Sequence, residues 1–313
     1  MSTDTPATNN LVDIQKPVTG RFPTESVIFD VPYSLQHSKA IVYSLFGYNE
    51  QHENCFSFHN YLQGLMINLR LARLLYVDWD IVLQTDSKTY VAFKDFFMQL
   101  PIVIEINDDD TPLCKAMLWR IRPAFYDQAY THIICRDLDS PLTYRERQCV
   151  HQWIEHDKTA HAITDSISHT IPLMGGMIGF KPNYFKWRMG VHKWDELLAQ
   201  THINFKTKGD DQTFLNSVVY PKIAGQGDDS ITQHYMLGMP NTFLSDYHNS
   251  VPDIALPLAE DLKESNSTCG HIGAAGYYQG PTFKFLSKYK EIFADFRKAE
   301  FLHRHIFFWG NEI

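Results

Sequence analysis

The sequence has few cysteines, and none of them forms a closely spaced pair. Its five cysteines are scattered, without the CxxC spacing that binds zinc or forms a redox couple. Such thiols are expected to stay reduced, as is typical of a cytosol-like compartment, so a cytoplasmic protein is predicted. The five are Cys55, Cys114, Cys135, Cys149 and Cys269.

The sequence also lacks an excess of positive charge and a long apolar run. There are 28 lysines and arginines against 36 aspartates and glutamates, which gives a formal net charge of −8. A broad interface with nucleic-acid phosphates is therefore not expected, although a local basic pocket for a small phosphate is compatible with this balance. No segment approaches the roughly 20 apolar residues of a membrane span, and the polar, proline-bearing start has no apolar signal region.

What is present is the pattern of an α/β protein. With 313 residues, 44% of them hydrophobic, the chain can bury the core of one large domain. Strand-length and helix-length segments alternate without internal repeats, which predicts βαβ units and a mainly parallel sheet with helices on both faces. The predicted strands are 39–47, 79–86, 101–108, 130–137 and 170–181, and the predicted helices are 60–76, 88–100, 112–127, 142–157 and 210–223.

Polar residues follow several of the predicted strands, where parallel sheets bind ligands. They include residues 47–49 and Asp86, but the strongest signal is Asp137 and Asp139, which end an apolar run. On extended chain these two side chains point the same way and repel each other unless a cation or a proton intervenes. Hard carboxylate oxygens suit Mg²⁺ or Mn²⁺, which also bind phosphate oxygens, so a diphosphate partner is favoured. A solvated strand end is the alternative.

Three later segments add to this pattern. Gly175 and Gly176 interrupt an apolar strand, which allows a ligand to approach closely, although a β-bulge would explain them equally. Asp211 and Gln212 stand at a predicted helix start, where a plain N-cap is the simpler explanation for the acid that precedes them. His271 lies in a small-residue loop, where its imidazole could be a third metal ligand.

In this order the segments resemble the GT-A fold nucleotide-sugar glycosyltransferases. The motifs CRDLDS, GGMIGFK and DDQTFL are similar to those of a smaller group of these enzymes, known from bacteria and large viruses. Glycogenin-like and lipopolysaccharide sugar transferases share an order of arginine, DxD, small-residue pair, Asp-Gln and late histidine. The matching residues here are Arg120, Asp137 and Asp139, Gly175 and Gly176, Asp211 and Gln212, and His271.

The resemblance implies a metal-dependent transfer of a sugar from a nucleotide-sugar to a glycan or other hydroxyl acceptor. The family favours UDP as the nucleotide. Asp137, Asp139 and His271 would hold Mn²⁺ or Mg²⁺. The implied donor-binding residues are Phe46, Gly47, Asn68, Arg120, Asp137, Asp165, Gly175 and Gly176.

The catalytic residues implied by the resemblance depend on the stereochemistry, which the sequence does not decide. Asp211 would be the general base of an inverting enzyme. Gln212, or the backbone near Gly175, would support a front-side path in a retaining enzyme. The chain departs from the family pattern at Pro141, where an arginine is usual, and after His271, where Lys-Pro-Trp is missing.

The chain is expected to consist of an N-terminal arm and one domain. We expect residues 1–30 to form a flexible arm or a loose wrap, and residues 31–313 to form one GT-A domain with a loop-rich C-terminal third. The oligomeric state is not indicated, and the cytoplasm would be that of the host if the protein is viral. The parts of the domain are a nucleotide-binding half (39–140), an acceptor half (141–280) and a C-terminal helix (281–304).

Two other functions remain open at this point. The stretch DLDSPLT resembles the nucleophile motif of haloacid-dehalogenase phosphatases, but that motif normally lies near the N-terminus and here about 130 residues precede it. A catalytically inactive sugar-nucleotide-binding module is the second alternative. The acids Asp137, Asp139 and Asp211, together with His271, argue against it.

Overall fold

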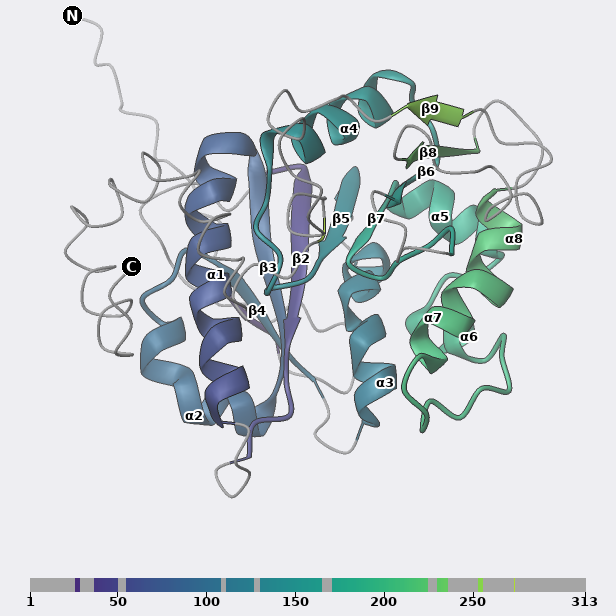
Figure 1. Ribbon diagram of the computed structural model, residues 1–313. Helices are drawn as coiled ribbons and strands as arrows, with labels where there is room; N and C mark the ends of the chain where they lie inside the picture. The colour runs from purple at the N-terminus through teal and green to yellow at the C-terminus, as the bar shows by residue number, and fades with distance from the viewer. Residues whose placement is uncertain are drawn as a thin grey trace, which may run out of the picture.

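Nine strands of the described residues form a single sheet in the computed structural model (Figure 1). Their order is β1-β4-β3-β2-β5-β7-β6-β8-β9, with β2–β3, β3–β4, β2–β5, β6–β8 and β8–β9 parallel and the other neighbours antiparallel. The predicted α/β class, with a mainly parallel sheet flanked by helices, is confirmed. The described residues are 26–28, 37–49, 55–107, 111–126, 130–164, 171–224, 230–235, 253–255 and 273.

The strands are β1 (Ser26–Ile28), β2 (Lys39–Leu45), β3 (Trp79–Asp86), β4 (Val103–Asn107), β5 (His132–Arg136), β6 (Ala160–Thr164), β7 (Met177–Phe180), β8 (Ile231–Tyr235) and β9 (Asp253–Ala255). The helices are α1 (Cys55–Leu75), α2 (Ser87–Phe97), α3 (Leu113–Ala116), the 3₁₀ helix η1 (Met117–Phe125), α4 (Tyr144–Glu155), α5 (Pro182–Met189), α6 (Trp194–Leu198), α7 (Asp210–Phe214), the π-helical η2 (Leu215–Val219) and α8 (Tyr220–Ile223).

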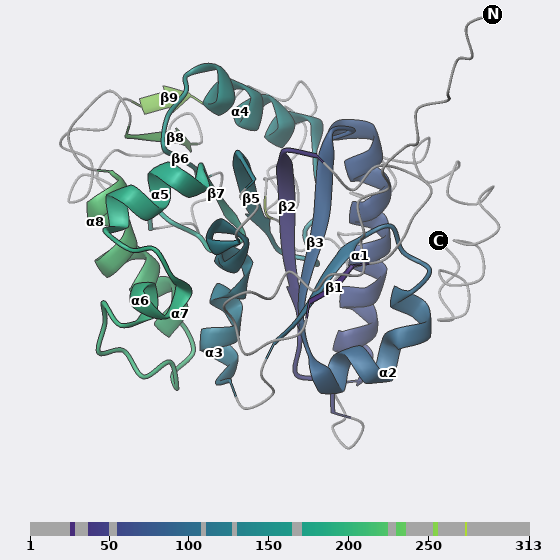
Figure 2. The same ribbon diagram turned by 180° about the vertical axis from the view of Figure 1, so that it is seen from behind.

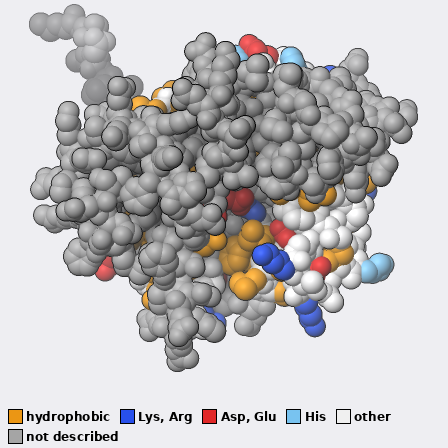
Figure 3. Space-filling model, viewed as in Figure 1, with side chains coloured by type: hydrophobic (Ala, Val, Ile, Leu, Met, Phe, Trp, Pro, Cys, Tyr) orange, Lys and Arg blue, Asp and Glu red, His pale blue; other side chains and the backbone are white. Residues whose placement is uncertain are grey.

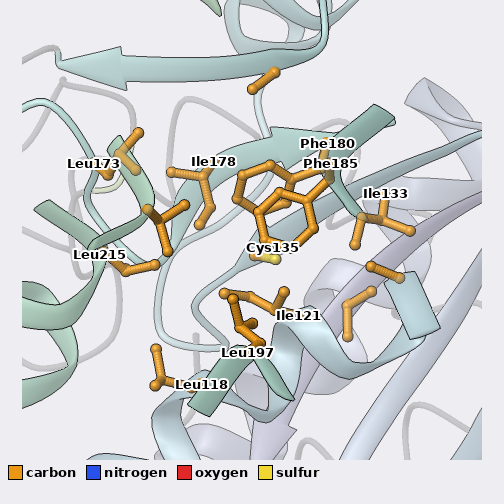
Figure 4. Close-up of a cluster of buried hydrophobic side chains, with 14 of the residues drawn as sticks. Leu118, Ile121, Ile133, Cys135, Leu173, Ile178, Phe180, Phe185, Leu197 and Leu215 are labelled. Carbon is orange, nitrogen blue, oxygen red and sulfur yellow. The ribbon is translucent and has the colours of Figure 1, made fainter. Parts of the chain in front are cut away.

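Helices cover both faces of the sheet (Figures 1 and 2). All eight residues of β3 are buried, as expected for a parallel strand packed on both faces. Successive residues of β5 enter opposite layers: Ile134 packs with α1, α2 and α4, whereas Ile133 and Cys135 pack with η1, α5 and α7. Figure 4 shows the second layer, in which the rings of Phe180 and Phe185 lie 4.5 Å apart.

Several elements differ from the sequence prediction. The strand expected over 170–181 begins only at Met177, so Gly175 and Gly176 lie in a turn before it. The segment 112–127, expected to be helical up to about Pro123, is divided into α3 and a 3₁₀ helix that continues past Pro123 to Phe125. The strands β6, β8 and β9 and the helices α5 and α6 were not predicted.

The two ends of the chain are described only in part. Three residues of the predicted N-terminal arm form β1, which pairs antiparallel with β4 at the edge of the sheet. The C-terminal helix predicted over 281–304 lies outside the described residues. In the part of the chain that is described, no helix is long and apolar enough to cross a membrane.

Candidate functional site

The loops after the parallel strands β2, β3 and β5 meet at one edge of the sheet. Asp86, the last residue of β3, links two of these loops through its carboxylate. It accepts a hydrogen bond from Thr89 N at 2.7 Å, which caps α2, and another from Gly47 N at 2.5 Å. Gly47 has a φ of +79°, a left-handed conformation that favours glycine. This edge is therefore built around a fixed turn at the end of β2.

Asp137 follows β5 and forms an ion pair with Arg120 of η1. The Arg120 side chain is 3% exposed and that of Asp137 is 42% exposed, so a buried cation meets a carboxylate that is partly open to solvent. Burial acts to lower the pKa of Arg120, but the charges of Asp137 and Asp211 contribute to a net rise above its ordinary value. Arg120 thus stays charged beneath the acids.

The 3₁₀ geometry of η1 explains how Arg120 reaches this position. With three residues per turn, side chains three positions apart lie on the same side. Leu118 and Ile121 share the side that packs in the core, and both are buried. Arg120 lies on another side, where its Nε donates to Met117 O at 3.1 Å while its terminal nitrogen turns to Asp137.

Gly175 and Gly176 let the turn before β7 approach this ion pair closely. A Cβ atom on Gly176 would lie 1.9 Å from Asp137 Oδ2, so the Asp137 carboxylate would have to move to make room for it. A Cβ atom on Gly175 would lie 3.2 Å from Arg120 Nη2. The backbone therefore approaches the charged side chains most closely at Gly176 and less tightly at Gly175, and the pair lies in a turn instead of a β-bulge.

Two further carboxylates lie near Asp137. Burial, and then the charge of Asp137, raises the pKa of Asp139 to about 6, and the charge of Arg120 opposes the rise. Burial also raises the pKa of Asp211, the second residue of α7. Three acids therefore surround one arginine, an arrangement that an additional cation would stabilise. On the face drawn in Figure 3, acidic and basic side chains of the described residues lie beside hydrophobic ones.

The amide of Gln212 is engaged with the backbone of the glycine turn, residues 173–176. Oriented by its hydrogen-bond partners, it donates to Leu173 O at 2.9 Å and accepts from Gly175 N at 3.1 Å. One turn further along the helix, Asn216 accepts from Leu173 N at 2.9 Å and donates to Leu173 O at 2.9 Å. Gln212 and Asn216 together fix this turn.

Asn68, predicted to bind the donor, lies on α1 beneath the acid loop, residues 137–142. Its side chain is fully buried. Its amide donates to Leu138 O at 3.2 Å and to Ser140 O at 3.1 Å, and it accepts from Leu142 N at 2.9 Å. The structure thus places Asn68 against the back of the loop that carries the two acids.

The residues proposed for the base of a nucleotide lie at the end of β2. Phe46 is half-buried, and its ring meets that of Trp119 edge to face, with centroids 5.4 Å apart. Gly47 beside it is exposed. An aromatic side chain next to exposed backbone offers a surface on which a base could stack.

Two predicted site residues, Asp165 and His271, lie outside the described residues. Within the described part, no group of three His, Cys, Asp or Glu side chains is placed to hold a metal ion. Asp137 and Asp139 still provide two hard oxygen donors, and the raised pKa of Asp139 marks a carboxylate whose negative charge is poorly compensated. These two acids fit Mg²⁺ or Mn²⁺ in donor type.

One buried ion pair near the site was not predicted. Arg136, at the end of β5, pairs with Glu146 of α4, and both side chains are almost inaccessible to solvent. Glu146 N also donates to Thr143 Oγ1 at 3.1 Å, which caps α4. The T-x-x-E spacing of Thr143 and Glu146 signals the helix start. Nothing local in the sequence signals the pairing with Arg136.

No protein-family model and no curated protein matches the chain, whereas solved structures do. A candidate nucleotide-diphospho-sugar transferase from Desulfovibrio desulfuricans aligns at 12% identity with a TM-score of 0.40, over 83% of this chain and 98% of that one. The 4-diphosphocytidyl-2C-methyl-D-erythritol synthase from Anaerococcus prevotii aligns at 11% identity with a TM-score of 0.41, over 81% and 98%.

A candidate glucose-1-phosphate thymidylyltransferase from Bacillus anthracis, solved with sucrose, aligns at 9% identity with a TM-score of 0.39. The alignment covers 64% of this chain and 88% of that one. At such identities and TM-scores these likenesses do not bear on the activity of the present chain, which has to be inferred from its site.

Proposed function

We propose that this chain is a metal-dependent glycosyltransferase that moves a sugar from a nucleotide-sugar, a UDP-sugar in the first instance, to a glycan or other hydroxyl acceptor. The observation that carries the proposal is the acid loop: Asp137 faces the open site, pairs with buried Arg120, and is approached by Gly176. Acids and one fixed cation at the carboxyl edge of a parallel sheet suit a bound diphosphate.

The donor would lie across this edge. Its base would contact Phe46 and Gly47, and its diphosphate would lie near Arg120. Asp137 and Asp139, with His271 as the third ligand, would hold Mn²⁺ or Mg²⁺. Such an ion, when bound, stabilises negative charge on the departing nucleoside diphosphate as a Lewis acid.

The acceptor chemistry would fall to α7. Asp211 is buried and its pKa is raised, both of which suit a general base that takes the acceptor proton in an inverting reaction. In a retaining reaction the backbone near Gly175 would support the departing group, and Asp211 would only position the acceptor. Gln212 would act through its bonds to the glycine turn. Asp165 would reach sugar hydroxyls.

The first experiment is a thermal-shift assay with UDP, GDP and TDP, each with Mn²⁺ or Mg²⁺. We expect UDP with the metal to raise the Tm, and Asp139→Asn to abolish the gain. Asp78→Asn is the matched control, because Asp78 is an exposed acid paired with Lys39 at the opposite end of the sheet. No shift with any of the nucleotides would contradict a nucleotide-sugar donor.

The second experiment is a hydrolysis screen over nucleotide-sugars, because many transferases slowly cleave their own donor. Release of a nucleoside diphosphate and free sugar supports glycosyl transfer. Formation of a nucleotide-sugar and pyrophosphate from a nucleoside triphosphate and a sugar phosphate would instead indicate nucleotidyl transfer. Release of phosphate from a generic ester without any acceptor would indicate a phosphatase. Metal-dependent nucleotide binding without any turnover would indicate a binding module.

A further inference from the structure

The acid loop is held from behind by one side chain that lies far away in the sequence. Asn68 makes three hydrogen bonds to the loop backbone, with Leu138, Ser140 and Leu142, across 70 to 74 residues of chain. Both amide hydrogens and the carbonyl oxygen are used. Because Asn68 is 0% exposed, its side chain is not available to a ligand in the open site.

The base of the loop is fixed separately. Arg136, the residue before Asp137, pairs with Glu146 and donates to Cys135 O at 2.7 Å and to Ile178 O at 3.0 Å. These bonds hold the end of β5 but do not reach past Asp137. The turn at Leu138, Ser140 and Leu142 is therefore held by Asn68 through bonds that the Arg136 network does not duplicate.

Fixing this turn has an electrostatic consequence. Asp137 and Asp139 repel each other, and an unrestrained turn could relax by moving the two carboxylates apart. A turn fixed in advance keeps them together without a cation, so less ordering remains to be done when one binds. Asn68 donates to the backbone carbonyls of Leu138 and Ser140, which flank Asp139, and so fixes the backbone position from which the Asp139 carboxylate extends.

We propose that Asn68 is a positioning residue, which fixes the turn of the acid loop so that Asp137 and Asp139 stay together for cation and diphosphate binding. The inference rests on the proposed function and gives Asn68 an indirect role in place of direct donor contact. The arrangement of Asn216 is similar, since it binds both backbone groups of Leu173 behind the glycine turn.

The test measures Mn²⁺ affinity without donor, by electron paramagnetic resonance of the free ion. Asn68→Leu keeps the approximate shape and removes all three hydrogen bonds, whereas Asn68→Asp keeps the acceptor for Leu142 N and loses both donors. We expect both variants to bind Mn²⁺ at least tenfold more weakly. Leu100→Ala, a fully buried truncation elsewhere in the core, lowers stability and is expected to keep wild-type affinity.

A second measurement is independent of whether the variants fold. In the wild-type protein the Leu142 amide hydrogen should exchange slowly with solvent, since it is bonded to Asn68 Oδ1. Fast exchange at Leu142 would overturn the positioning role, as would wild-type Mn²⁺ affinity in both Asn68 variants. If the wild-type protein itself binds no Mn²⁺, the proposed function fails first, and the role of Asn68 in cation binding fails with it.

Discussion

The acid loop and the glycine turn form two walls of the candidate site in opposite ways. The acid loop contributes charge, through Asp137 and Asp139, while the glycine turn contributes the absence of side chains at Gly175 and Gly176. Both are held from behind by buried amides, and in each case the amide binds backbone. One wall supplies the groups that bind, and the other supplies the space in which they can bind.

A second comparison shows that a raised carboxyl pKa does not by itself mark the site. Asp80, at the amino-terminal end of β3, has its pKa raised by burial to about 6, as Asp139 does at the opposite edge. Asp80, however, lies 2.9 Å from His37 Nδ1, and His37 opposes the rise. For Asp139 the largest contribution from a neighbouring charge comes from another acid, Asp137, and it adds to the rise. The difference lies in the neighbours, which favour an added cation only at Asp139.

The largest change in stability is expected from substitution of one of the two arginines next to the acid loop, Arg120 and Arg136. Arg136→Met would leave Glu146 buried without its charged partner, and we expect a loss of about 3–5 kcal/mol in the free energy of unfolding. Chemical denaturation measures it. Arg120→Met would leave Asp137, whose side chain is 42% exposed and can be hydrated, so the loss should stay below about 1 kcal/mol.

The two arginines should show the reverse order in activity. Arg120→Met removes a fixed cation from the place proposed for the diphosphate, and a fall of about 100-fold in donor turnover is expected. Equal losses of stability in the two variants would contradict the distinction between a buried structural pair and a pair at the open site.

Much of the fold and part of the site could be predicted from local patterns. The strand at Trp79–Asp86 was predicted with its observed bounds, because a short segment centred on the apolar residues Ile81, Val82 and Leu83 is a local signal. Arg120, Asp137 and the two glycines were predicted as site residues, and the structure brings them together. Arg120 and Asp137 are charged, and the two glycines interrupt a segment of apolar residues. Neither feature is expected of a buried core segment, so these residues stand out in the sequence.

The rest depends on partners that a local pattern does not contain. The role of Asn68 depends on backbone groups more than 70 residues away, and the bond from Gly47 to Asp86 spans 39 residues. The strands β6 and β8 were missed because His161 and His234 interrupt their apolar pattern, although both side chains are buried.

The next largest loss of stability is expected when a side chain is added to the glycine turn. Gly176→Ala would place a Cβ atom 1.9 Å from Asp137 Oδ2, so either the Asp137 carboxylate must move or the two walls must separate. We expect a loss of about 1–3 kcal/mol in stability from this overpacking and weaker Mn²⁺ binding because Asp137 is displaced. Thermal unfolding and metal titration measure both.

Gly175→Ala is the matched variant for this test. Its Cβ atom would lie 3.2 Å from Arg120 Nη2, a contact that a shift of a few tenths of an ångström relieves. We therefore expect smaller losses of both stability and Mn²⁺ affinity than for Gly176→Ala. An unchanged Tm and unchanged Mn²⁺ affinity in Gly176→Ala would show that the two walls are not in contact.

A different kind of effect should come from acid, and it acts behind the glycine turn, where β6 lies next to β7. His234 is buried on β8, with its ring 5.4 Å from that of His161 and its Nε2 2.9 Å from Gln152 Oε1. Burial, and then the charge of His156, lowers the pKa of His234 to about 3. Burial also lowers the pKa of His161, with further contributions from His234 and Arg136.

Because the folded-state pKa of His234 lies below the unfolded value of roughly 6.5, the unfolded chain binds the proton preferentially. The contribution of His234 to stability is therefore complete above about pH 6.5 and is lost as the pH falls toward 3, by about 1.4 kcal/mol per pH unit. His234→Gln, which does not titrate, should flatten the decline measured by chemical denaturation between these values, whereas His192→Gln at an exposed position should leave it unchanged. Equal slopes in all three proteins would mean that His234 does not link protons to folding, and acid sensitivity would then have to come from carboxylates whose pKa is lowered in the folded protein, such as Asp78 and Asp157.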